Sequence, residues 1–413
     1  MPRGVVAVGV LVRDAVTRPD QRALHRVLDR LRHRRQDRLI DLADGRVGAV
    51  IGLLRGHDVG RLREGSLAQV HDHELGAERL ARGEYDAALD WFRQGASLGD
   101  IAALEHALQL QQREQGKLAT AVWLQQQINS GTIAPDAVRP DKRAELGLWP
   151  DNTPLVTGYQ SMAGCTLSLQ PVATQQAGVN TWQQLLQHWQ HDQQLAKLPV
   201  CFLPLHRVNS VALACSEDSS TLVQCDYPEL NELVAQGRFS QLLVIAGRGK
   251  ASYNNGILQL PDNADMALLR HEFMHIFGFI DEYALAPATA AEVCRPGKIH
   301  PNLLLATDVD AYMQYWKLAE VPTLTAVDSC SAAGIQAYRV IADDNVMRFY
   351  ELPLPDHYFQ LIQLILRQPE QLMPVQYYYA YLARQRQDWE KWQQFMQQAS
   401  AMGYEDAKQA LAP

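Results

Sequence analysis

The sequence predicts an α+β domain in the middle of the chain, with α-helical repeat hairpins on either side of it. Small and aromatic residues recur at helical spacing near both ends, over 76–134 and 371–413. Between them, residues 155–370 mix short β-rich runs, such as Leu242–Ala246, with helical stretches. Residues 135–154 are rich in Pro and Asp and are expected to form a linker. A chain of 413 residues, 47% of them hydrophobic, is long enough for several domains.

The first 75 residues differ from the rest of the chain in charge. They hold 14 Arg, no Lys and 10 acidic residues, a net charge of +4, whereas residues 76–413 carry −12. Three interpretations stay open: a basic arm centred on Arg30–Arg35 for an acidic partner, an Arg-rich helix from about Pro19 to Leu42 with a solvated face, or a stretch that is not natural protein. Residues 4–12 resemble the hydrophobic part of a signal peptide, but no convincing cleavage site follows them.

Composition argues against two classes of protein and favours one kind of compartment. The net charge of −8 argues against a nucleic-acid-binding protein. No run approaches the ~18 apolar residues of a membrane-spanning helix, so an integral membrane protein is not expected. All six cysteines lie between Cys165 and Cys330, without a C-x-x-C pair. This pattern predicts two or three disulfides and a periplasmic or secreted protein, with six free thiols in a cytoplasmic enzyme as the alternative.

The two helical segments repeat short stretches of sequence. The run Gly83–Phe92 recurs loosely 33 residues later, starting at Gly116. The residues from Ala96 to Ala103 have a counterpart in Ser400 to Ala407. These residues resemble the Sel1-like branch of the tetratricopeptide-repeat family, and the resemblance implies helical hairpins that serve as a scaffold or bind a partner protein. Because roughly three hairpins are needed for a stable stack, the two segments are expected to pack on each other or on the middle domain.

One short helix of the middle domain carries the residues of a metal site. Asp262 or Asp265 is expected to cap a helix from Met266 to about Phe277. This helix contains an H-E-x-x-H motif, His271-Glu272-Phe273-Met274-His275. Residues i and i+4 lie on one helix face, so both imidazoles can bind one ion. Glu272 is then placed to bond a metal-bound water as a general base. The alternative is a core helix whose histidines are merely hydrogen-bonded.

The residues after His275 extend the motif to H-E-x-x-H-x-x-G-x-x-D. Gly278 is expected to end the helix with a positive φ and to turn the chain back toward the histidines. Asp281 then becomes the third metal ligand, and Glu282 is its rival for that role. Two imidazoles and one carboxylate are a donor set typical of a catalytic zinc site.

Residues 271–283 resemble the metzincin zinc peptidases, with Asp281 where the family's motif normally has His. They are most similar to the bacterial family that includes immunoglobulin A-cleaving metallopeptidases, which shares the D-E-Y ending at Tyr283. The resemblance covers roughly 240–350, where a hydrophobic strand and a Gly/Asn-rich turn precede the helix. It implies a zincin-like catalytic domain with bound Zn²⁺.

Metzincins also have a Met-containing turn beneath the metal. Met347 is the best match to it, and an ordinary core Met is the alternative. Some members have a Tyr two residues after that Met, where this chain has Phe349. Tyr283, Tyr350 and Arg348 are the candidates for the auxiliary role that the Tyr plays.

These residues predict a zinc-dependent endopeptidase that acts on a protein or peptide substrate. Glu272 takes a proton from the attacking water and passes it to the leaving amine. A strand at Ile257–Leu260 is expected at the edge of the sheet, where an extended peptide can add as a further strand. Two alternatives differ in kind: a non-catalytic repeat protein with a structural metal, and a metal-dependent hydrolase of a non-peptide substrate.

Overall fold

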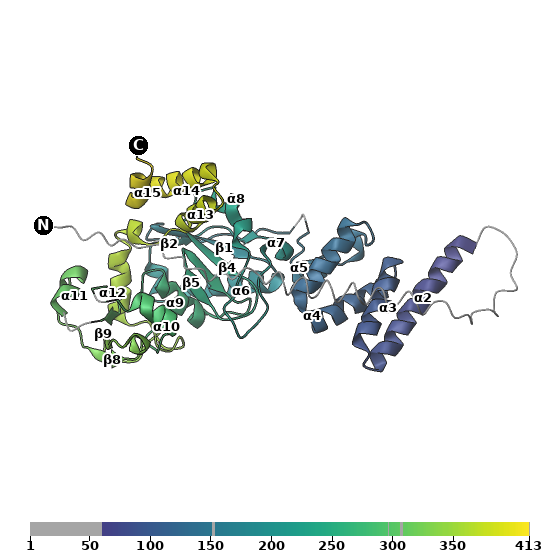
Figure 1. Ribbon diagram of the computed structural model, residues 1–413, viewed down its shortest axis with the longest axis horizontal. Helices are drawn as coiled ribbons and strands as arrows, with labels where there is room; N and C mark the ends of the chain where they lie inside the picture. Colours follow the sequence, from purple (N-terminus) through teal and green to yellow (C-terminus); the bar gives the residue numbers. More distant parts are fainter. Residues whose placement is uncertain (1–59, 151–152, 296, 306–308, 413) are drawn as a thin grey trace. The chain divides into compact units, whose positions relative to one another are not determined.

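The computed structural model describes residues 60–150, 153–295, 297–305 and 309–412, with side chains described from residue 71 onward (Figure 1). The fold described below is that of the compact unit Gly65–Pro413, together with the start of the helix that leads into it from Gly60. The basic run Arg30–Arg35 and the helix expected between Pro19 and Leu42 lie outside the described residues.

Helices alone make up the N-terminal part of the described chain. They are α2 (Gly60–Ala81), α3 (Tyr85–Ser97) and α4 (Ile101–Asn129). α3 packs against α4, and Phe92 and Ala103 are fully buried there. α4 is interrupted at Gly116, and both carboxylate oxygens of Glu217 accept from the Leu118 N–H at 3.2 Å just after the break. A residue from the middle of the chain therefore caps the second half of α4.

Replacing Gly116 with Ala is expected to destabilise the protein by about 1–3 kcal/mol. Its φ of 87° and ψ of 171° are open essentially to Gly alone, and a Cβ at this position lies 2.3 Å from Glu217 Oε2. Gly131 is a matched control, because its φ is also positive but an added Cβ meets nothing within 4 Å. Thermal unfolding of both Ala variants measures the difference. A Gly116→Ala protein that melts at or above Gly131→Ala would contradict the expectation.

The segment 135–150, the described part of the expected linker, is packed against α4. It carries η1 (Pro135–Ala137) and α5 (Pro140–Glu145), and each begins with its proline in the first turn. A proline there lacks an N–H that the helix does not need, so it starts a helix and does not break one. Val138, Leu146 and Leu148 are buried against α4 residues such as Leu124.

A mixed sheet of six strands forms the centre of the fold. Its order is β2-β1-β4-β6-β5, with β3 paired to β1. All neighbours are parallel except β5 and β6, which are antiparallel. The strands are β1 (Leu167–Ala173), β2 (Val200–Phe202), β3 (His206–Arg207), β4 (Gln241–Ile245), β5 (Ser252–Asn254) and β6 (Ile257–Leu260).

The expectation that Ile257–Leu260 is an edge strand is wrong. These residues form β6, which pairs with β4 on one side and with β5 on the other, and all four are buried. Asn255 and Gly256 both have positive φ, as a two-residue hairpin turn requires. The turn folds Ser252–Asn254 back along β6, so β5 becomes the edge strand.

Helices cover both faces of this sheet, and β4 divides its side chains between them. Leu243 and Ile245 join a core with helices α6, α9 and α12, whereas Leu242 and Val244 join a second core with α8, α13 and α14. This alternation is the period of two that a strand buried on both faces requires. The elements between the strands are α6 (Gln176–His191), η2 (Leu195–Lys197), α7 (Ser210–Leu213), η3 (Tyr227–Leu230) and α8 (Asn231–Val234).

A second, smaller sheet follows the metal-motif helix, with the order β7-β9-β8. The elements of this part are α9 (Met266–His275), α10 (Pro287–Val293), β7 (Leu303–Leu304), α11 (Val309–Trp316), β8 (Thr325–Val327), η4 (Ser331–Ala333), β9 (Ala337–Arg339) and α12 (Asp356–Ile365). The mixture of helices with two sheets agrees with the α+β class expected from the sequence.

The C-terminal helices cover one face of the central sheet (Figure 1). They are η5 (Pro369–Gln371), α13 (Val375–Gln385), α14 (Trp389–Ala401) and α15 (Glu405–Ala410). Tyr379 and Phe395 are buried, and Val375 N donates to Ser240 O at 2.8 Å. The segment 371–413 therefore packs on the middle domain, one of the two arrangements expected. None of the helices described has the length and apolar character to cross a membrane.

The six cysteines form three pairs at disulfide distance, as the sequence predicted. The pairs are Cys165–Cys201, Cys215–Cys225 and Cys294–Cys330. The first holds β2 at one edge of the central sheet, and the last lies beside the smaller sheet. A periplasmic or secreted location stays a prediction.

Candidate metal centre

Helix α9 is held by a cap at its start and by side-chain contacts along its length. The Asp265 carboxylate accepts from the Leu268 N–H at 2.8 Å and caps its start, so the second of the two expected caps is confirmed. Arg270 pairs with Asp192 at 2.7 Å, which ties α9 to the end of α6. Phe273 is fully buried and packs edge-on against Trp189. These contacts fix the orientation of α9, and its opposite face carries His271 and His275.

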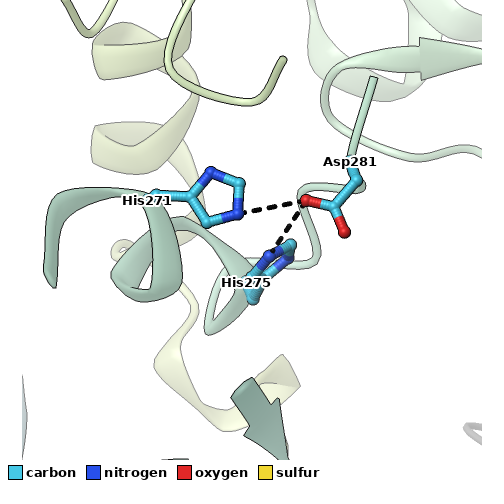
Figure 2. Close-up of side chains that lie close together, drawn as sticks. All are labelled: His271, His275 and Asp281. Atoms are coloured by element: carbon cyan, nitrogen blue, oxygen red, sulfur yellow. Dashed lines mark ion pairs between the residues drawn. The ribbon is translucent and has the colours of Figure 1, made fainter. Parts of the chain in front are cut away.

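Three side chains meet at this face (Figure 2). The Nε2 atoms of His271 and His275 lie 3.2 and 3.4 Å from Asp281 Oδ1. Gly278, with φ +82°, turns the chain after α9 so that Asp281 returns to the histidines, as the sequence predicted. The three residues offer ligand atoms within 4.8 Å of one another and could hold a metal ion.

Backbone carbonyls orient both imidazoles. His271 Nδ1 lies 2.7 Å from Val346 O, and His275 Nδ1 lies 2.8 Å from Phe279 O. A carbonyl oxygen only accepts, so each Nδ1 carries a proton and Nε2 is the ring nitrogen that faces Asp281. This is the arrangement in which histidines ligate metals.

Burial and neighbouring charges shift the ionisation of the site in opposite directions. Burial lowers the pKa of His275, but the adjacent Asp281 carboxylate outweighs this and raises it to about 9. Burial raises the pKa of Asp281, yet its contacts with the two histidines bring it below its ordinary value. For Glu272, burial dominates and raises the pKa despite the nearby histidines. The cluster therefore concentrates negative charge on Asp281 and keeps Glu272 ready to accept a proton.

Two buried oxygens at this site lack hydrogen-bond partners among the described residues, Glu272 Oε2 and Asp281 Oδ1. Buried polar atoms are nearly always paired, and those that are not call for a functional explanation. Asp281 Oδ1 is the atom that faces both imidazoles, so a cation there would satisfy it. Glu272 follows the first histidine, and the charges of His271, His275 and Asp281 act on its carboxylate, although it is not a member of the ligand group.

Glu282 does not belong to the ligand group. Its carboxylate is fully buried and accepts hydrogen bonds from Tyr358, Asn302 and Asn345. Among the described residues, the group that could hold a metal contains Asp281 and not Glu282. The geometry thus favours Asp281 over its rival.

The supporting residues named from the sequence lie near the ligands. Met347 is fully buried in the main core, and its carbonyl accepts from the Glu282 N–H at 2.9 Å. Its role as a floor beneath the metal stays a prediction. Tyr283 is 45% exposed, and its hydroxyl interacts with the Asp281 carboxylate; burial and this negative charge raise its pKa. Phe349 and Tyr350 are exposed beyond the turn.

Comparison with protein-family models and with curated protein sequences finds no match to this chain. The resemblance of residues 271–283 to metzincins and that of the terminal helices to Sel1-like repeats therefore stay predictions.

Proposed function

We propose that this protein is a zinc-dependent metallopeptidase in which His271, His275 and Asp281 hold the ion and Glu272 is the general base. The observation that carries the proposal is the buried Glu272 carboxylate, one residue after a ligand, whose Oε2 has no partner among the described residues. Structural zinc sites use four protein ligands and leave no open position. Three protein ligands beside a spare carboxylate favour a catalytic site over a structural one.

The spacing of the donors suits zinc. A tetrahedral zinc ion with bonds of about 2.0–2.1 Å has edges of about 3.3 Å between its ligand atoms. The distances from Asp281 Oδ1 to the two Nε2 atoms, 3.2 and 3.4 Å, agree with two such edges. Two imidazoles also disfavour Ca²⁺ and Mg²⁺, which take mainly oxygen ligands.

Each residue of the centre then has a distinct role. When bound, zinc lowers the pKa of a coordinated water and polarises the scissile carbonyl. Glu272, with its pKa raised by burial, accepts the proton of the attacking water and delivers it to the leaving amine. The Tyr283 hydroxyl stays protonated at neutral pH beside Asp281, where it can donate a hydrogen bond to the developing oxyanion.

The edge strand β5 supports a peptide as the substrate. α9 packs against β5 and β6. The edge strand β5 therefore lies next to the helix that carries His271 and His275. An extended peptide can pair its backbone with such an edge, which binds the main chain without demanding one sequence. β5 is therefore the proposed peptide-binding strand, in place of Ile257–Leu260, which the sequence predicts at the edge.

Elemental analysis and casein hydrolysis together test the proposal. The expected result is about one zinc per chain, with cleavage that stops on chelation and returns on adding zinc. Asp281→Ala should lose the zinc and the activity together. A chain that binds no zinc after reconstitution would contradict the proposal. Zinc-dependent hydrolysis of small esters without any cleavage of casein would favour a non-peptide substrate.

A further inference from the structure

The Glu282 carboxylate is the centre of a buried hydrogen-bond network directly behind the metal ligands. Tyr358 Oη and Asn302 Nδ2 donate to Oε1 at 2.6 and 3.0 Å. Asn345 Nδ2 donates to Oε2 at 2.7 Å, and Arg339 Nη1 lies 3.9 Å from the same oxygen. These partners come from four separate segments of the chain.

The orientation of both amides is fixed by other contacts. Asn302 Oδ1 accepts from Ile280 N at 2.9 Å, and its Nδ2 donates to Ile280 O at 2.7 Å. Asn345 Oδ1 accepts from Met347 N at 2.9 Å. Both amides must therefore present N–H groups to Glu282, and a side chain with two accepting oxygens is needed between them. Gln would place an N–H against one of these donors.

The same network fixes the backbone that carries the third ligand. We call Phe279–Glu282 the ligand strap. Six of its backbone groups are bonded to side chains or to the Met347 turn. The partners are His275 for Phe279 O, Asn302 for Ile280 N and O, Ser329 for Asp281 O, Met347 O for Glu282 N, and Arg348 for Glu282 O. These contacts with the rest of the protein hold the ligand strap in place.

Asp281 and Glu282 are neighbours whose side chains have different surroundings. The Asp281 carboxylate faces the imidazoles, whereas the Glu282 carboxylate is fully enclosed by the network. Anchoring Glu282 therefore limits the directions in which Asp281 can point. A ligand ordered before the ion arrives loses less conformational entropy on binding it.

We propose that Glu282 is a positioning residue, which presents Asp281 to the histidines and so raises the affinity of the centre for its metal. The inference rests on the proposed function, because it assumes that the three residues bind a metal. Glu282 touches no ligand atom itself and acts through the strap.

Titration of the metal-stripped full chain with Co²⁺ tests this role, since bound Co²⁺ reports its geometry through its visible absorption band. Glu282→Gln is expected to weaken Co²⁺ binding about 10- to 100-fold, the range found for outer-shell partners of metal ligands, and to alter the band. Glu292→Gln, on the exposed side of α10, is the control and should leave both unchanged. Asp281→Ala marks the effect of losing a ligand.

A paired exchange separates positioning from a general loss of structure. In Glu282→Gln with Asn345→Asp, amide and carboxylate trade places, so the hydrogen bond between the two side chains and the net charge are kept, and only the 3.5 Å contact from Asn345 Nδ2 to Asp343 O is lost. The double variant is expected to recover most of the lost affinity and the original band. If Glu282→Gln does not fold, Tyr358→Phe replaces it; that variant removes one donor and should weaken binding in the same direction.

Two results would overturn the role of Glu282 alone. One is binding of Co²⁺ by Glu282→Gln or Tyr358→Phe with unaltered affinity and band, while Asp281→Ala loses the ion. The other is a double variant that binds no better than Glu282→Gln. Failure of the unaltered chain to bind Co²⁺ or Zn²⁺ is a different result, because it removes the proposed function together with this inference.

Discussion

Replacing Glu272 with Gln is expected to lower peptide hydrolysis by about 10²- to 10⁴-fold while the metal stays bound. Gln has the same shape but cannot take a proton from water. The metal is retained because the ligand group consists of His271, His275 and Asp281, and Glu272 is not a member of it. Zinc content and the rate of casein cleavage, measured on the same preparation, check both parts of the expectation.

The control for this substitution is His275→Ala, which removes a ligand and should lose metal and activity together. Loss of zinc from Glu272→Gln would show that the carboxylate is a ligand. Full activity in Glu272→Gln would show that another group is the base. Either result would remove the argument for a catalytic centre that rests on the unpaired Glu272 oxygen.

The grouping of His271, His275 and Asp281 could be predicted from the sequence because it depends on local geometry. The i and i+4 spacing on one helix determines how His271 and His275 face each other. Gly278, three residues after His275, turns the chain so that Asp281 returns to the two histidines. The sequence cannot choose between Asp281 and Glu282 as the third ligand, because the two neighbouring carboxylates differ mainly in the residues that surround them in the fold.

The residues that support the ligands could not be predicted, because they come from distant segments. Asn302, Ser329 and Tyr358 follow the motif by 20 to 80 residues and belong to no pattern that the sequence displays. Asn345 lies two residues before Met347. The sequence draws attention to this run through Met347 and gives no sign of the role of the Asn345 amide. Their convergence depends on how β9, α12 and the loops pack.

The assignment of the edge strand failed for a related reason. The sequence predicts the turn at Asn255 and Gly256. Which of the two strands that it joins lies at the edge of the sheet depends on the pairing of β6 with β4. The Pro-rich composition of 135–154 predicts a linker, and in its described part Pro135 and Pro140 begin η1 and α5, because Pro at the first position of a helix favours that helix. Composition alone does not separate these two uses of Pro.

Removing the Cys294–Cys330 disulfide is expected to weaken both the fold and the metal centre. Cys330 follows Ser329, whose Oγ donates to Asp281 O at 2.7 Å, so this disulfide holds a residue that orders the ligand strap. Its two cysteines are 36 residues apart, and closing a loop of that length stabilises a protein by about 4 kcal/mol. Cys294→Ala with Cys330→Ala should lower the free energy of unfolding by about that amount and weaken metal binding about 10-fold or more.

The chain contains a matched control for this prediction. Cys165–Cys201 also spans 36 residues, so its removal carries the same loop entropy. Cys201 lies in β2, whereas α9 packs against β5 and β6 at the opposite edge of the sheet. Cys165→Ala with Cys201→Ala should therefore reduce stability by a similar amount but leave metal affinity unchanged at temperatures where both proteins are folded. Equal loss of metal affinity in the two double variants would mean that general loosening, and not the contact from Ser329 to Asp281, determines how tightly the ion is held.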